Sequence, residues 1–308
     1  MSFSLVSRRR SPHGPFLPML ALPLIAVLLA VLPTSADVPA DRTVEGTYGE
    51  PMHYPKFFDE TAFDVAIRRA AGEPSRPVPG VRAAVFPHHW LAGHLITETL
   101  RDIAASGDFD RVILIGPNHV NAGSPIAATS DLAWQTPVGR LDADEGAVAG
   151  LEQAGAAAIE PGVLTYEHSI AGIVPALAYY LPDAHIVPII TRHGMTADEV
   201  HSLANLLADM MSERTVLLAS VDFSHYLPAE IARSRDGETI TALENFNTAT
   251  ILGFDNDHLD SAPSMATLVE TMRLIGATSF DLRDNTNSAD LGGPPNEPVT
   301  SYVTGFFQ

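Results

Sequence analysis

The chain has 308 residues, 46% of them hydrophobic, and a formal net charge of −19 at pH 7. A protein this acidic repels nucleic acid and anionic lipid, so we expect a small molecule, a peptide or a metal ion as its partner. The absence of cysteine excludes disulfides, thiolate chemistry and cysteine-type zinc sites. A metal site would therefore use histidine, carboxylate or hydroxyl ligands.

The first 36 residues have the pattern of a secretory signal segment. Arg8 to Arg10 form a basic region, Phe16 to Leu32 an apolar region, and Thr34 to Ala36 a small-residue cleavage site. Cleavage would release the mature protein into the periplasm or the medium, without stable membrane contact. The alternative is a retained anchor, because the apolar run is close to the length of a membrane helix.

Residues 37–80 are rich in proline, glycine and charged residues, which predicts an extended arm with one short helix from Thr61 to Ala71. Residues 81–308 are expected to form one domain. Their apolar, partly β-branched runs predict buried strands at Ala83–Phe86, Val112–Ile115, Ile186–Ile190, Val216–Val221 and Ser301–Phe306. Helical patterns separate these strands, at Ala92–Ala105, Ala143–Ala154, Ile170–Tyr180, Ala197–Met211, Ile231–Leu252 and Ser264–Ile275.

This alternation predicts an α/β fold, a three-layer α/β/α sandwich with a central, mostly parallel sheet. A polar stretch, Asn285 to Ser288, is expected to be a solvated loop before the last strand.

Two histidines follow predicted strands directly. His88 comes after Ala83–Phe86 and Pro87, and His119 comes after Val112–Ile115 and a Gly-Pro turn. Ligands of open α/β sheets bind at the carboxyl ends of the strands, so the two imidazoles could converge on one metal ion. Taken singly, each histidine is more often a hydrogen-bonded loop residue.

Two further segments carry polar groups at element ends. Asp222, Ser224 and His225 follow the strand Val216–Val221, where His225 could act as acid or base and Asp222 could orient it or bind metal. Glu167 and His168 precede a helix and could face the same pocket in a catalytic role. Helix capping explains both segments equally well. The remaining histidines, including His53 and His193, are adequately explained as surface or interface residues.

Six segments occur in the order in which they are found in Memo-like proteins, also named AmmeMemoRadiSam system protein B: FPHHW, VILIGPNH, WQTPVGRLDAD, YEHSI, IVPII and ASVDFSHY. The chain resembles this family over residues 81–226 and, more loosely, to Phe307. The resemblance implies a fold similar to the LigB-type class III extradiol dioxygenases, which bind non-haem Fe(II).

By this resemblance, His88, His119 and His168 match the histidines of the family's Pro-His, Gly-Pro-x-His and Glu-His-Ser motifs. Human-type members have a cysteine as the third metal position, within an Asp-Phe-Cys-His motif, and here that position is Ser224. Serine is a poor ligand unless deprotonated, so Asp222, His168 or His225 could complete the site instead. Fe(II) is the favoured metal, with Zn(II), Mn(II) or copper as alternatives.

Three functions remain open at this point. The first is an exported metal-binding oxidoreductase of dioxygenase type, with His88, His119 and one of Asp222, Ser224 or His168 as ligands. The second is a metal-dependent hydrolase in which Glu167 or His225 acts as base. The third is a binding or adaptor module without enzymatic activity. The sequence also leaves a homodimer open.

Overall fold

An eight-stranded sheet organises this computed structural model, which describes residues 51–124, 126–294 and 297–308. The predicted signal segment, residues 1–36, lies outside the described residues. The strand order is β6-β3-β7-β2-β8-β1-β10-β9. The strands are β1 (Ala83–Phe86), β2 (Arg111–Pro117), β3 (Ala127–Thr129), β6 (Ala158–Ile159), β7 (His185–Thr191), β8 (Thr215–Ser220), β9 (Phe280–Asn287) and β10 (Ser301–Phe307).

The four central strands are parallel. β1 pairs with β8, β8 with β2, and β2 with β7, all in parallel register. The antiparallel contacts lie nearer the edges, between β3 and β7, β1 and β10, and β10 and β9. β1, β2 and β8 therefore end side by side at one edge of the sheet, and their next residues meet there.

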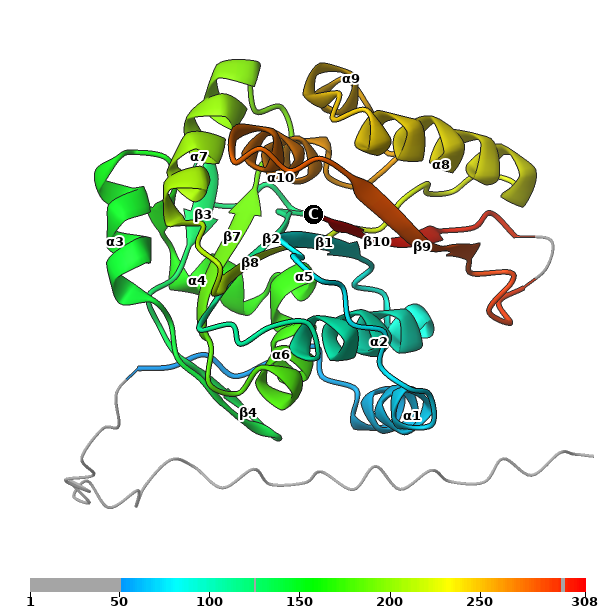
Figure 1. The fold of residues 1–308 in the computed structure, drawn as a ribbon, viewed down its shortest axis with the longest axis horizontal. Helices are drawn as coiled ribbons and strands as arrows, with labels where there is room; N and C mark the ends of the chain where they lie inside the picture. Colours follow the sequence, from blue (N-terminus) through cyan, green and yellow to red (C-terminus); the bar gives the residue numbers. More distant parts are fainter. Residues whose placement is uncertain (1–50, 125, 295–296) are drawn as a thin grey trace, which may run out of the picture. The chain divides into compact units, whose positions relative to one another are not determined.

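Alternate residues of the central strands point to opposite faces of the sheet and pack into two separate apolar cores. Val85 and Ile113 pack into one apolar cluster, whereas Ala84 and Leu114 pack into the other. Helices cover both faces of the sheet, as Figure 1 shows. One face carries α3 (Glu145–Gln153), α7 (Ala197–Met210), α8 (Ala229–Glu244), α9 (Thr248–Leu252) and α10 (Ala262–Leu274). The other carries α1 (Glu60–Ala71), α2 (Gly93–Ala104), α4 (Pro161–Thr165), α5 (His168–Ala171) and α6 (Val174–Tyr180). The predicted three-layer α/β/α sandwich is thus confirmed.

The chain before β1 packs onto this domain. Phe63 of α1 and Val78 are buried in the same apolar cluster as Ala84. A short 3-10 helix, η1 (Trp90–Ala92), connects β1 to α2. Among the described residues, no helix is long and apolar enough to span a membrane.

Two predicted helices are divided. The predicted helix Ile231–Leu252 is interrupted after Glu244, because Phe246 has a φ of 49° and the Asn247 side chain accepts the Thr250 N–H to begin α9. The predicted helix Ile170–Tyr180 is divided between the end of α5 and α6, and Pro175 stands in the first turn of α6, where its missing N–H is tolerated.

The prediction of a loop at Asn285 to Ser288 was wrong for its first three residues. Asn285 to Asn287 belong to β9, an edge strand that pairs with β10. Its side chains are mostly exposed or half-buried, so the strand lacks an apolar pattern, and backbone pairing alone sets its conformation. A small hairpin, β4 (Trp134–Thr136) and β5 (Gly139–Leu141), was also not predicted.

Candidate metal centre

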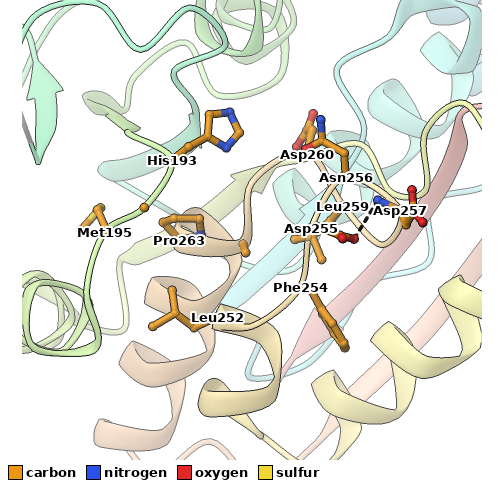
Figure 2. A pocket seen from close by; sticks show the side chains of 12 residues that line it. His193, Met195, Leu252, Phe254, Asp255, Asn256, Asp257, Leu259, Asp260 and Pro263 are labelled. Atoms are coloured by element: carbon orange, nitrogen blue, oxygen red, sulfur yellow. Dashed lines mark hydrogen bonds between the residues drawn. The ribbon is translucent and has the colours of Figure 1, made fainter.

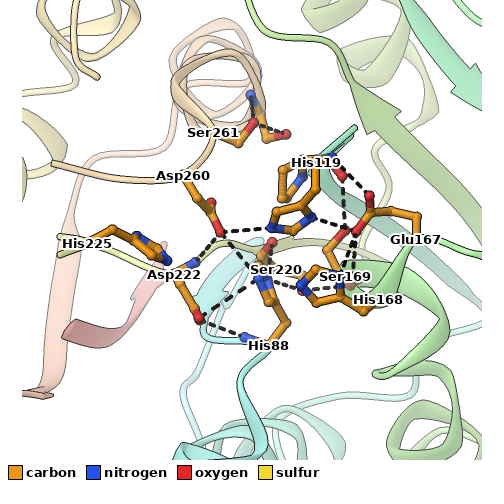
Figure 3. Close-up of polar contacts among 12 residues, drawn as sticks. His88, His119, Glu167, His168, Ser169, Ser220, Asp222, His225, Asp260 and Ser261 are labelled. Carbon is orange, nitrogen blue, oxygen red and sulfur yellow. Dashed lines mark hydrogen bonds and ion pairs between the residues drawn. The ribbon is translucent and has the colours of Figure 1, made fainter. Parts of the chain in front are cut away.

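The ends of three neighbouring parallel strands place the predicted ligands together. His88 follows β1, His119 follows β2, and Asp222 follows β8. His88 and Asp222 are buried, at 5% and 3% exposure. The His88 N–H donates to Asp222 Oδ1 at 2.9 Å, which ties the two loops together. The expected convergence at the carboxyl edge of the sheet is therefore present (Figure 3).

Three imidazole rings lie against one another at this edge. Ring centroids are 5.2 Å apart for His88 and His119, 5.1 Å for His88 and His168, and 4.0 Å for His119 and His168. One nitrogen from each ring lies within 4.8 Å of the others, so the three side chains could share one metal ion. His168, named from sequence as a catalytic candidate, thus belongs geometrically with the predicted ligands.

A second carboxylate, Asp260, joins the cluster and was missed from the sequence. Its Oδ2 lies 3.2 Å from His88 Nε2 and 3.7 Å from His119 Nε2. His88, Asp222 and Asp260 form a second buried group that could hold a metal ion. Asp260 immediately precedes Ser261, which caps α10 by accepting the Ser264 N–H. An acid beside a helix cap was the only available signal, and it is a common pattern without functional meaning.

The carboxylate of Asp260 is only partly satisfied by the protein. Oδ2 faces the two histidines, whereas the buried Oδ1 has no hydrogen-bond partner among the described residues. Buried carboxylates are normally paired, and a cation removes the cost of an unpaired oxygen. The donor set of imidazoles and carboxylates fits non-haem Fe(II), Zn(II) or Mn(II).

Glu167 orients His119. Its Oε1 accepts from His119 Nδ1 at 2.8 Å, and its Oε2 accepts the His119 N–H at 3.0 Å. The same carboxylate caps α5 by accepting the Ser169 N–H at 3.0 Å. A carboxylate that fixes one ring nitrogen of a metal-binding histidine directs the other toward the ion. Glu167 thus caps α5 and orients His119 at the same time, and both of its carboxylate oxygens are already hydrogen-bonded.

Close packing of α5 against β2 makes this contact achievable. A Cβ atom at Gly116 would lie 2.7 Å from Ser169 Oγ, so only glycine fits there. Ser169 Oγ itself donates to the Pro117 carbonyl at 3.1 Å. The Gly-Pro turn after β2 is thereby held against the start of α5, which brings Glu167 to His119.

Carboxylates decide the charge of two of the three imidazoles. Burial alone would lower the pKa of His88, but Asp222 and Asp260 outweigh it and raise the pKa to about 9. Burial also opposes protonation of His119, yet hydrogen bonds to Asp260 and Glu167 raise its pKa to about 10. A divalent cation would replace the protons that these carboxylates stabilise in the metal-free protein.

The third imidazole behaves in the opposite way. Burial and the neighbouring positive charges of His88 and His119 lower the pKa of His168 to about 4. His168 is consequently neutral at pH 7, which is the state in which imidazole binds metal. Burial raises the pKa of Glu167, but its hydrogen bonds with His119 dominate and lower it to about 2.

His225 lies at the edge of the same pocket. Its Nδ1 lies 2.6 Å from the Phe223 carbonyl oxygen, and since a carbonyl only accepts, Nδ1 carries the proton. The hydrogen bond therefore leaves Nε2 as the other nitrogen of this ring. The next residue, Tyr226, has a φ of 59° and is 78% exposed, an uncommon conformation for an aromatic residue.

Ser224 is not brought together with these donors. Its hydroxyl donates to Asp236 Oδ1 at 2.7 Å and is 3.2 Å from the Ala232 carbonyl, both in α8. Ser301 Oγ donates to the same Asp236 oxygen at 2.6 Å. The hydroxyl of Ser224 thus helps to attach α8 to the sheet, and a role in metal binding remains only a prediction from the sequence.

The cluster opens into a cavity of about 620 Å³. Its lining includes His88, His119, His168, Asp222 and His225, together with apolar side chains. Asp260 lines a different cavity, of about 470 Å³, which Figure 2 shows with Asp255 and Asp257. Within the described ranges, however, the only groups of three acidic or histidine donors close enough to share an ion contain His88.

Comparisons with known proteins identify the family. A family model described as Memo-like protein matches residues 60–306. A MEMO1 family protein of Methanopyrus kandleri is 31% identical over 240 residues, 75% of this chain and 83% of that protein. One of Methanosarcina mazei is 34% identical over 233 residues, 72% and 84% of the two chains.

A solved structure resembles the fold at low identity. An uncharacterized protein from Escherichia coli K12 has a TM-score of 0.50 and 11% sequence identity, and the match covers 72% of this chain and 99% of that one. This likeness shows the fold alone.

Proposed function

The chain belongs to the Memo-like protein family, and we propose that it binds one divalent metal ion, Fe(II) in preference, and oxidises a small organic molecule with dioxygen. The observation that carries this proposal is the convergence of buried His88 with the partly exposed His119 and His168, with donor nitrogens within 4.8 Å of one another. The carboxylate of Asp260 lies beside His88 and His119. A pocket that leaves one side of the cluster open gives substrate access.

The protein's contribution to such a reaction is positioning and proton transfer. His88, His119 and His168 would hold the ion together with a carboxylate of Asp260 or Asp222, and Glu167 keeps the His119 ring in one orientation. When bound, Fe(II) supplies the redox chemistry that dioxygen requires. His225 lines the pocket with its Nδ1 bonded to the Phe223 carbonyl, so Nε2 is the nitrogen that would accept the proton of a substrate hydroxyl.

Metal analysis tests the proposal directly. The protein would be purified without chelating resins and analysed by plasma mass spectrometry, beside the His88→Ala/His119→Ala double variant and a His193→Ala control on an exposed loop. We expect near-stoichiometric metal in the wild type and control, and loss in the double variant. After anaerobic loading with Fe(II), oxygen uptake with a catechol panel should require His88, His119 and His225.

Other outcomes point to other functions. Stoichiometric zinc with oxygen-independent turnover of esters or amides would contradict oxidation and identify a hydrolase. No bound metal after attempted loading would contradict both and leave a binding module as the better account.

We also propose that the mature protein acts outside the cytoplasm, because its first 36 residues combine a basic, an apolar and a small-residue region. Expression of the full chain, cell fractionation and N-terminal sequencing would check this. A soluble extracytoplasmic product starting near residue 37 is expected, and an unprocessed chain in the membrane fraction would contradict cleavage.

A further inference from the structure

One wall of the candidate metal pocket comes from residues 51–59, which we call the wall segment. The match to the family model begins at residue 60, immediately after it. Phe57 and Asp59 of the wall segment line the pocket together with His88, His119 and His168.

The wall segment is fixed at its first end by His53. The His53 N–H donates to the Ala133 carbonyl, and the His53 carbonyl accepts the Gln135 N–H, both at 2.8 Å. The imidazole bonds to Ser130 Oγ and Thr165 Oγ1, each at 2.7 Å, and stacks on the Trp134 ring at 4.2 Å. His53 is only 2% exposed, so the expectation of a surface or interface position was wrong.

The other end is fixed by Asp59, whose side chain accepts the Ala62 N–H and caps α1. Between the two anchors, neighbouring phenylalanines have different surroundings. Phe58 packs against Phe63 of α1, with ring centroids 5.2 Å apart. Phe57 is 43% exposed and lies edge-on to His168, at 5.8 Å between centroids. The segment is therefore held rigidly while one aromatic ring remains available to a ligand.

Other aromatic side chains line the same pocket. Tyr226 is 78% exposed and held at a positive φ, and Trp90 is fixed by its Nε1–H bond to the Gly172 carbonyl. Exposed aromatic side chains around a polar centre indicate a binding site, since water alone would not favour them there. Strained backbone at such a position is typical of functional sites.

We propose that the wall segment is a specificity element and that Phe57 contacts the ligand. The ligand class is a small molecule with a metal-binding polar head and a flat apolar ring, the head at the histidine cluster and the ring against Phe57. Binding of the head group rests on the proposed metal function. Binding of the apolar ring at Phe57, which we call the ring site, is inferred from the aromatic side chains alone. The cavity of about 620 Å³ is large enough for such a molecule.

Two hydroxamates that share a chelating group, only one of which has an aromatic ring, would measure how much the ring site contributes to affinity. Benzohydroxamate and acetohydroxamate would be titrated calorimetrically into metal-loaded wild type, Phe57→Ala, Phe57→Trp and Phe58→Ala. An aromatic contact changes affinity about 2- to 12-fold. We expect wild type to prefer benzohydroxamate, Phe57→Ala to lose about 3- to 10-fold of that preference, and acetohydroxamate binding to stay unchanged.

Two further variants distinguish loss of a ligand contact from loss of protein stability. Phe57→Trp should keep the preference, and Phe58→Ala should lower thermal stability but leave the preference intact. Equal preference in wild type and Phe57→Ala would overturn the proposal.

A second probe does not depend on metal. Broadening of the fluorine NMR line of para-fluorophenol by metal-free protein should occur with wild type and Phe58→Ala and be lost with Phe57→Ala. If this pattern holds while neither hydroxamate binds, the metal function fails and the ring site stands. If both hydroxamates bind but no probe depends on Phe57, the ring site fails and the metal function stands.

Discussion

His88 and His53 are both nearly fully buried, at 5% and 2% exposure, yet their surroundings give them opposite charge preferences. Asp222 and Asp260 overcome the effect of burial at His88 and raise its pKa to about 9. At His53, whose ring bonds to two neutral hydroxyls, burial outweighs the charge of Asp131 and lowers the pKa to about 4. Burial alone therefore does not decide the charge of a histidine, because carboxylates close to the ring can reverse its effect on the pKa.

The largest expected effect is a crossed pair of substitutions. His88→Ala removes a metal donor and should weaken metal binding by more than about 100-fold, beyond the range known for outer partners of metal ligands. His53→Ala should leave metal affinity unchanged but lower stability by about 2 to 4 kcal/mol, because it opens a cavity and removes the hydrogen bonds to Ser130 and Thr165. Competition titrations and denaturant unfolding would measure both. Equal loss of metal binding in the two variants would remove the distinction.

Acid pH sharpens the comparison. The folded-state pKa of His53 is below the unfolded value of about 6.5. Its stabilising contribution is therefore complete above pH 6.5 and is lost as the pH falls toward 4. Metal-free wild type should lose about 2 to 3 kcal/mol more across this window than His53→Gln. Unfolding of both proteins across this pH range tests it, and parallel curves would contradict the assignment.

Glu167 tests how the histidine cluster is oriented. Glu167→Gln keeps the shape but weakens the bonds to His119, so metal affinity should fall by about 10- to 100-fold. Glu160→Gln is a suitable control, because Glu160 accepts the Ser124 N–H away from the cluster. An affinity for metal within twofold of wild type would show that His119 needs no such support.

The smallest effect on metal is expected at Ser224. Ser224→Ala removes one hydrogen bond to buried Asp236 and should cost about 1 to 3 kcal/mol of stability, with metal affinity changed less than about twofold. Metal titration and thermal unfolding of this variant separate the two roles. A marked loss of metal affinity would restore Ser224 as a ligand.

The fold was largely predictable because its central strands have a pattern that local sequence carries. Strands buried on both faces are continuously apolar, as in β1 and β8, and the predicted boundaries differ by few residues. Edge strands failed for the opposite reason. β9 is held by backbone pairing to β10 and presents polar side chains to solvent, so no periodicity marks it.

The sequence by itself determined the two-faced sheet and the positions of His88, His119 and Asp222, because a polar residue directly after a buried strand must lie at the sheet edge. Only the tertiary structure decided which groups share that edge. Asp260 approaches from the start of α10, Phe57 arrives on a segment fixed by His53, and Ser224 is bonded to Asp236 beneath α8. These contacts join residues far apart in the chain, and their geometry depends on how helices pack on the sheet, which no local pattern records.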